Sequence, residues 1–266
     1  MTNIHYAVQA CDLKSYQSSK RFCGDDRTLL SKKSIASLIR SIEYCADTRP
    51  DSNHVINIIK DTCSPELTLF LDDLVRRVDH PRITITLSDL APDTGVVASI
   101  RACYLWLAQN GKDLIFQVQD DYLFSLACVH DSVEHFYTAL GDTQSQCIIQ
   151  PYNDMTYWHF QYKNLSTPRL ISLGTKGYWI QIYDTSCSFL TSHGQFQQHW
   201  DLYDRFFELI PTASSDNPVL ENRSLNCMFT QRGVLGLTPV NTLSHHIQTQ
   251  PDLYVDWQPL WHDIQV

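Results

Sequence analysis

The sequence predicts an α/β fold built on a mixed, mostly parallel sheet that is flanked by helices, and three observations support this prediction. Through the first half of the chain, short apolar runs of strand length alternate with apolar stripes at helical spacing. Strands separated by helices of this length pair in parallel and are covered on both faces. The second half contains runs in which apolar and polar residues alternate, a pattern typical of antiparallel strands. Because the sequence contains no repeat, low-complexity block or linker, we expect residues 1–266 to form one continuous domain.

Capping and turn residues set the expected bounds of the elements in the first half. We expect strands at residues 5–10, 55–59 and 83–86, separated by helices. The first helix is expected to begin at Ser34, which can cap an apolar stripe that ends at Cys45. A serine cap followed by Pro65 starts the second helix, and Gly111 is expected to end the third, residues 94–110, in a left-handed conformation. The polar connection at 11–33 is long enough to suggest a functional loop.

The second half changes character after residue 125. Ser125 can cap a helix that runs to Leu140, and residues 147–150 form a short apolar strand. Residues 157–183 are dense in aromatic side chains, and the alternation at 178–183 predicts a hairpin. The rings of Trp158 and Trp179 could stack on a sugar, although large aromatic side chains more often belong to the core. We expect a helix at 195–209, an exposed loop at 212–217 and no regular element from 248 onward.

Composition narrows the class of protein. Hydrophobic residues make up 43% of the chain and charged residues 18%, which suits a globular domain with a sizeable core. The net charge of −9 argues against a nucleic-acid or anionic-membrane surface. The nine cysteines include no C-x-x-C pair, so we expect reduced thiols in a cytoplasmic setting. No signal-peptide pattern and no 18-residue apolar span occurs, so we expect a protein that is neither secreted nor membrane-spanning by its own signals.

Two adjacent carboxylates, Asp120 and Asp121, follow the apolar run that begins at Leu114. A charge at the end of a buried strand is costly unless it is paired or bound to a metal. Open α/β sheets bind ligands at the carboxyl ends of their strands, and two carboxylates there suit a hard divalent cation and, through it, a diphosphate. In an acidic protein, a phosphorylated ligand needs such a cation. A solvated turn after the strand is the alternative interpretation.

Several short motifs occur in the order that one enzyme family uses. They are Asp61 at the end of the second strand, Asn110-Gly111-Lys112-Asp113 before the next apolar run, Gln119-Asp120-Asp121, Leu220-Glu221-Asn222-Arg223-Ser224-Leu225-Asn226, and Ser244-His245-His246 after Thr238-Pro239. Over roughly residues 4–248 the chain therefore resembles the GT-A fold glycosyltransferases, which use nucleotide-sugar donors. The specific likeness is to small single-domain enzymes of viruses, phages and bacteria that are distantly similar to family 2.

The resemblance implies a GT-A fold in which residues 1–125 bind the nucleotide-sugar and residues 126–266, with the antiparallel strands, bind the acceptor. It implies a metal-assisted, inverting transfer of a sugar from a UDP- or GDP-sugar to a hydroxyl of a glycan or another acceptor, in the cytoplasm (the host's, for a viral enzyme). Mn²⁺ or Mg²⁺ is the implied cofactor, which suits oxygen ligands with one imidazole. The implied site residues are Asp121 and His246 for the metal, Asp61 for the nucleobase, Asp120 for the ribose or a metal-bound water, and Glu221 for the general base.

The remaining assignments stay open at this point. Arg21 and Arg101 are candidates to pair with the phosphates, or else to form structural salt bridges. His246 is preferred to His245 because an aliphatic residue follows it, as in the family pattern, and an exposed histidine pair without a ligand is the alternative. Asn222 replaces the aspartate that acts as base in many inverting members, which leaves Glu221 as the nearest carboxylate. The alternative role of Glu221 is a first-turn glutamate that favours the helix dipole.

Other classes of protein fit less well. A dehydrogenase would need G-x-G-x-x-G after the first strand, and residues 8–12 contain no glycine; a P-loop is also missing. A nucleotidyltransferase acting on sugar phosphates also uses carboxylates with a divalent metal, so it is the nearest enzymatic alternative. A non-catalytic protein that binds sugar nucleotides on a GT-A fold is the third candidate, because Asn222 cannot act as a base.

Overall fold

The fold was analysed in a computed structural model that describes residues 1–12, 26–91, 95–143, 146–153, 170–174, 176–184, 188–210, 221–247 and 256–266. In chain order the elements are β1 (Thr2–Ala10), α1 (Arg27–Thr48), β2 (Ser52–Lys60), α2 (Pro65–Arg77), β3 (Ile83–Asp89), α3 (Val96–Asn110), β4 (Leu114–Val118), β5 (Tyr122–Phe124), α4 (Cys128–Thr143), β6 (Cys147–Ile149), β7 (Ile171–Gly174), β8 (Gly177–Ile182), β9 (Phe189–Ser192), α6 (His193–Gln198), α7 (Trp200–Leu209), the 3₁₀ turn η2 (Glu221–Arg223), α8 (Cys227–Gln231), β10 (Leu235–Pro239), β11 (Ser244–His246) and α9 (Gln258–Asp263).

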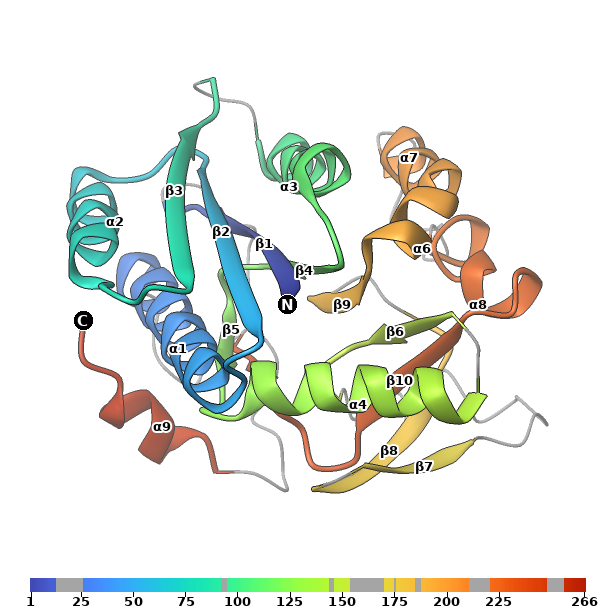
Figure 1. Ribbon diagram of the computed structural model, residues 1–266. Coiled ribbons are helices and arrows are strands. Elements are labelled where there is room, and N and C mark those ends of the chain that lie inside the picture. Colours follow the sequence, from blue (N-terminus) through green and yellow to red (C-terminus); the bar gives the residue numbers. More distant parts are fainter. Residues whose placement is uncertain are drawn as a thin grey trace.

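The predicted α/β architecture is confirmed: a large mixed sheet carries helices on both faces (Figure 1). Its nine strands follow the order β3-β2-β1-β4-β9-β6-β10-β8-β7. The strands β3, β2, β1 and β4 are parallel, β9 is antiparallel to both β4 and β6, and β10 is parallel to β6. The predicted hairpin is β7–β8, which closes the far side of the sheet in antiparallel pairing. The carboxyl ends of β1, β2, β4, β6 and β10 therefore lie along one edge.

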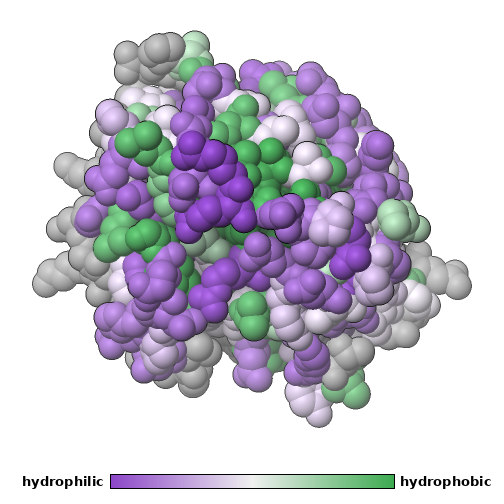
Figure 2. Space-filling view, turned by 60° about the vertical axis from the view of Figure 1, so that its left-hand side comes forward, coloured by the Kyte–Doolittle hydropathy of each residue, from purple (hydrophilic) through white to green (hydrophobic). Residues whose placement is uncertain are grey.

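Two apolar layers hold the sheet between the helices. One layer joins it to α1, α2, α4 and α9, and the other joins it to α3, α6, α7 and α8. Strand β1 serves both layers, since Tyr6 and Val8 point into the first and Ala7 into the second. From the side that carries α2 and α9, hydrophobic residues gather in patches that hydrophilic residues separate (Figure 2). Among the described residues, none of the helices combines the length and the hydropathy that crossing a bilayer requires.

Local signals were right for some helix ends and wrong for others. Ser64 caps α2 as expected, since its Oγ accepts the N–H of Leu67. The cap of α1 lies eight residues before the predicted cap Ser34, because Asp26 accepts the N–H of Leu29. Gly111 does follow α3, but with φ −57° rather than a left-handed conformation. Its glycine is needed for close packing, since a Cβ there would lie 2.7 Å from the ring of His193.

Three further differences concern the second half. Helix α4 begins at Cys128 rather than directly after Ser125, and the predicted helix at 195–209 is two helices that meet at His199. A short helix, α9, occurs in the tail where no element was expected. A separate two-stranded ribbon, β11–β5, was also unexpected, and it positions the site described below. Trp158 and the predicted loop at 212–217 lie outside the described residues.

Candidate functional site

Aspartates follow three neighbouring parallel strands at the edge where their carboxyl ends meet. Asp12 follows β1, Asp61 follows β2, and Asp120 and Asp121 follow β4. Hydrogen bonds tie the three connections together, since the N–H of Cys11 donates to Asp120 Oδ2 at 2.8 Å and the N–H of Asp61 donates to the carbonyl of Ala10 at 2.9 Å. All four aspartates are buried. The edge therefore concentrates negative charge in a place where its desolvation is costly, which is a mark of a binding site.

Asp120 is held in a fixed orientation. Its Oδ2 accepts the N–H of Cys11 and also the hydroxyl of Ser31 in α1, at 2.9 Å. The side chain is only 4% exposed, and this burial raises the pKa of Asp120 to about 6. Arg27 lowers it and Asp121 raises it, and the two hydrogen bonds give smaller reductions. The carboxylate that the sequence placed at the ribose is thus anchored to β1 and α1 through one oxygen.

Asp121 lies against His246, and the β5–β11 ribbon explains how. In that ribbon His246 pairs with Tyr122, and the N–H of Ile247 donates to the carbonyl of Asp121 at 2.8 Å. His246 Nε2 lies 3.2 Å from Asp121 Oδ2, and the ring of Tyr122 stacks on the imidazole with centroids 4.7 Å apart. Burial, the largest single effect, would raise the pKa of Asp121, but the charge and hydrogen bond of His246, with smaller contributions from Arg27 and a backbone hydrogen bond, together lower it.

His245 points elsewhere, which separates the two histidines. Its ring stacks on Trp257, with centroids 5.5 Å apart, and the side chain is buried. Burial lowers the pKa of His245 to about 4, and His246 contributes in the same direction. The structure thus brings His246, and not His245, to Asp121.

The Asp121–His246 pair has the chemistry of a partial metal site. Two atoms bound at right angles to one divalent ion, each at about 2.1 Å, lie about 3 Å apart. The observed 3.2 Å between Oδ2 and Nε2 fits that arrangement. Within the described ranges, no cluster of three or more His, Cys, Asp or Glu side chains could enclose an ion by itself. These donors suit an open site, in which phosphate oxygens and water supply the remaining ligands of Mn²⁺ or Mg²⁺.

Asp61 presents an oxygen that the described part of the protein leaves without a hydrogen bond. The side chain is 1% exposed, its Oδ1 accepts the hydroxyl of Thr62 at 3.0 Å, and its Oδ2 is buried with no partner. Thr62 takes a φ of +53°, an uncommon conformation for a residue other than glycine. A buried carboxylate oxygen left open beside local backbone strain suits hydrogen bonding to a ligand N–H or O–H.

Two other predicted site residues that the structure describes, Arg101 and Glu221, make contacts outside this cluster. Arg101, on α3, forms an ion pair of 2.9 Å with Asp204 of α7, which is the structural alternative considered for it. Glu221 begins η2, and its backbone carbonyl accepts the N–H of Asn226 at 2.8 Å. Arg21 lies outside the described residues. Neither the base role of Glu221 nor the phosphate role of the two arginines is decided by these positions.

Sequence reasoning missed two residues of the site. Arg27, the first residue of α1, lies close enough to Asp120 and Asp121 to lower the pKa of each, and its Nη2 donates to the carbonyl of Cys11 at 3.3 Å. Asp12 accepts the hydroxyls of Thr28 and Ser64 at 2.7 and 2.5 Å, and so links the loops after β1 and β2. For Asp12 a signal was present in the sequence, because an aspartate follows each of β1, β2 and β4.

Comparison with known proteins gives only weak likenesses. No protein-family model and no curated protein matches the chain. Among solved structures, the galactosyltransferase LgtC in complex with donor and acceptor sugar analogues is 11% identical over 88% of this chain and 73% of its own, with a TM-score of 0.44. A UDP-glucose pyrophosphorylase from Acinetobacter baumannii is 7% identical over 94% and 90%, with a TM-score of 0.47. An inositol-1-phosphate CTP transferase from T. maritima is 12% identical over 98% and 95%, with a TM-score of 0.44. At these scores the function must be argued from the site.

Proposed function

We propose that this chain is a GT-A glycosyltransferase that moves a sugar from a UDP- or GDP-sugar to a hydroxyl of a glycan or another acceptor. The observation that carries the proposal is the Asp121–His246 pair, a carboxylate and an imidazole set 3.2 Å apart at the carboxyl edge of the sheet. The transfer is proposed to be inverting and assisted by Mn²⁺ or Mg²⁺. The free thiols of the described cysteines support a reducing, cytoplasmic setting, and the enzyme type proposed is the small single-domain one of viruses, phages and bacteria.

Each residue at the edge has a proposed part in binding the donor. Asp121 and His246 would hold a divalent ion, which when bound supplies positive charge to the departing diphosphate. Asp61 accepts a hydrogen bond from the nucleobase through its open Oδ2. Asp120, fixed by Ser31 and Cys11, orients the ribose or a water at the metal. Arg27, beside both carboxylates of the β4 connection, is well placed to pair with a phosphate.

The chemical step needs a group that takes the proton of the acceptor hydroxyl. Glu221 is the proposed base, because Asn222 beside it cannot accept a proton at neutral pH. Its position at the start of η2, in the half of the chain assigned to the acceptor, supports this choice. Arg21 and Arg101 stay candidates for further phosphate contacts, and for Arg101 that role requires release of Asp204.

Two other functions use the same site differently. A nucleotidyltransferase would join a nucleotide to a sugar phosphate and release pyrophosphate, with the same carboxylates and metal. A non-catalytic protein would bind the nucleotide-sugar and release no product. Metal-linked diphosphate binding by Asp121 and His246 is expected for all three functions. Only the products of the reaction can therefore distinguish the glycosyltransferase, the nucleotidyltransferase and the binding protein.

The deciding experiment has two stages. A thermal-shift panel of nucleoside diphosphates and their sugars, with and without Mn²⁺, identifies the donor, because a ligand of the native state raises the melting temperature. Incubation with that donor, radiolabelled in the sugar, then follows. Transfer of label to a glycan supports the glycosyltransferase. Pyrophosphate released from a nucleoside triphosphate and a sugar phosphate would instead establish the nucleotidyltransferase, and binding without product would establish a binding protein.

A further inference from the structure

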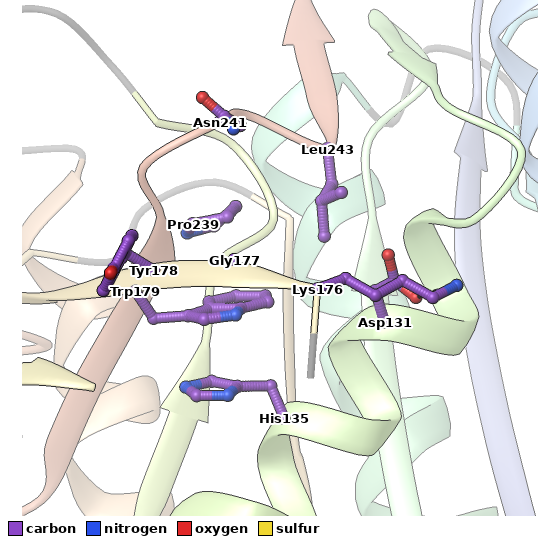
Figure 3. Close-up of a pocket in the computed structure, with 9 residues that line it drawn as sticks. All are labelled: Asp131, His135, Lys176, Gly177, Tyr178, Trp179, Pro239, Asn241 and Leu243. Atoms are coloured by element: carbon purple, nitrogen blue, oxygen red, sulfur yellow. Dashed lines mark ion pairs between the residues drawn. The ribbon is translucent and has the colours of Figure 1, made fainter. Parts of the chain in front are cut away.

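A small pocket lies between α4, the β7–β8 hairpin and the connection from β10 to β11 (Figure 3). Its volume is about 70 Å³. Helix α4 contributes Asp131 and His135, the hairpin contributes Lys176 and Trp179, and the connection contributes Asn241 and Leu243. The described residues that line the pocket all belong to the second half of the chain.

The apolar wall of the pocket is formed by a stacked pair of rings. The ring of Trp179 lies over the ring of His135, with centroids 4.3 Å apart and planes 7° from parallel (Figure 3). Gly174 makes this stack possible, because a Cβ there would lie 2.7 Å from Trp179 Nε1 and 2.9 Å from His135 Nδ1. A ligand that enters meets an aromatic group already fixed in place, which lowers the entropic cost of binding.

The polar groups of the pocket stand opposite this wall. Asp131 Oδ1 lies 3.2 Å from Lys176 Nζ and 2.9 Å from His130 Nδ1. Asn241 adds an exposed amide on the other side. The carboxylate disfavours an anion, and the charged groups disfavour a purely apolar ligand. A saccharide fits both walls, since its hydroxyls bond to carboxylate, amide and ammonium groups while its C–H faces pack on aromatic and aliphatic side chains.

The pocket shares an edge and a connection with the Asp121–His246 pair. It adjoins the carboxyl end of β10, whose axis is three strands, or about 14 Å, from the axis of β4, and its lining residue Leu243 is three residues before His246. The chain runs from Asn241 directly into β11, which carries His246. Side chains also bridge the two places, because Tyr152 packs edge-on against His246 and Asn153 Nδ2 donates to the carbonyl of Val240 at 3.0 Å.

We propose that this pocket receives one edge of a sugar residue of the acceptor glycan, the rest of which lies outside the pocket, and that this residue is not the one whose hydroxyl reacts. This inference rests on the proposed function, since the separation from the diphosphate site matters only if a sugar is transferred there. Asp121 and His246 are not among the residues that line the pocket, so a sugar held here is not the one whose hydroxyl reacts and suits a residue further along the glycan. The enzyme should therefore select acceptors of more than one sugar residue.

Saccharide binding can be tested on the whole protein without a donor. Saturation-transfer-difference NMR with a panel of methyl glycosides and their disaccharides and trisaccharides should give signals for at least one sugar type. The variants Asn241→Ala and Asp131→Asn should weaken that binding about tenfold or more, because each removes a hydrogen-bonding group. Asp73→Asn is the matched control, since Asp73 also forms an ion pair but lies on α2, away from the pocket. Melting temperatures check that both pocket variants fold.

Two outcomes would overturn the inference. Absence of signals across the panel, or equal binding by the parent and both pocket variants, excludes a saccharide site here. Binding of UDP or GDP with Mn²⁺, measured on the same samples, reports on the proposed function separately. If the parent binds the saccharide but no UDP or GDP, the proposed function is refuted and the pocket remains a saccharide site. If the parent binds UDP or GDP but no saccharide, only the pocket proposal is refuted.

Discussion

Replacement of Asp121 by asparagine tests the carboxylate–imidazole pair directly, and its effect on stability can be worked from the structure. The variant loses the charged partner of His246, whose Nε2 lies 3.2 Å from the carboxylate. A hydrogen bond to a charged group contributes about 1.5–3 kcal/mol. Because the two side chains are 12% and 21% exposed, solvent screens the pair in part, so we take the lower value. A loss of about 1.5 kcal/mol lowers the melting temperature of a domain of this size by about 3–6 °C, which leaves the fold intact.

Nucleotide binding should suffer far more than stability. Changing a residue that only supports a metal ligand already costs about 10–100-fold in metal affinity. Loss of a ligand itself should therefore weaken the Mn²⁺-dependent binding of UDP or GDP by about 100-fold or more, as measured by isothermal titration calorimetry. His246→Gln should behave alike, and the double variant should be little worse than either single one, because both residues hold the same ion.

Asp113, at the opposite end of β4 from Asp121, provides a matched control for the loss of a carboxylate. Asp113 precedes β4 and accepts the N–H of Asn3 at 2.8 Å, so Asp113→Asn also removes a hydrogen-bonded carboxylate without touching the proposed site. It should bind nucleotide and Mn²⁺ like the parent. If Asp121→Asn also binds like the parent, or if the losses in Asp121→Asn and His246→Gln simply add, the pair does not hold a shared ion.

Three further predictions follow from other residues. Asp61→Asn should weaken nucleotide binding by about tenfold to the same extent with and without Mn²⁺, and a loss confined to the metal-containing titration would contradict the nucleobase role. Glu221→Gln should lower turnover by about 10²–10⁴-fold at unchanged donor affinity, and a product that keeps the donor's anomeric configuration would exclude it as the base. Burial lowers the pKa of His54 to about 4, below the 6.5 of the unfolded chain. The free energy of unfolding is therefore unaffected by His54 above pH 6.5 and falls by on the order of 3 kcal/mol as the pH drops to 4, because the unfolded chain binds the proton more tightly. Urea denaturation of the parent and of His54→Gln across this pH range checks the prediction.

Some of this architecture could be read from the sequence because its signals are local. Ser64 followed by Pro65 marks the start of α2, and the structure has the same cap. Alternation at 178–183 predicted a hairpin, and β7–β8 is one. The start of α1 was predicted wrongly although its signal is also local, because the cap at Asp26 lies within a polar stretch that resembled a loop. The boundary between α6 and α7 at His199 depends on packing, and no Gly or Pro in the sequence marks it.

Some parts of the site also have local signals in the sequence, and other parts do not. An aspartate at the end of β2 or β4 is visible in the sequence, and parallel pairing then places these ends together. The approach of His246 to Asp121 spans 125 residues and depends on the register of β5 and β11, which no local pattern gives. Only the family resemblance suggested that pair. Arg27 was missed because its neighbours in sequence lie in the polar connection, whereas its neighbours in space are the β4 carboxylates.

Helix α1 fixes the segment that carries the carboxylates. Among the described strands, β5 pairs only with β11, so its remaining backbone groups need other partners. One serine of α1, Ser37, supplies such a partner, and two others bond to residues just before and after β5. Ser31 donates to Asp120 at 2.9 Å, Ser37 accepts the N–H of Phe124 at 3.0 Å, and Ser41 accepts the N–H of Val129 at 2.9 Å. The segment from β4 to α4 is therefore set by the position of α1 as well as by the sheet.

The C-terminal segment extends this support to the other half of the pair. Lys33, on α1 and almost fully buried, donates from Nζ to the carbonyl of Ile264 at 3.0 Å and so anchors the end of α9. Trp257, just before α9, stacks on His245, the neighbour of His246. One helix thus holds the Asp121 side through its serines and the His246 side through the C-terminal segment. Because both sides depend on α1, a change at Lys33 or Trp257 should alter the alignment of Asp121 and His246 although neither residue touches them.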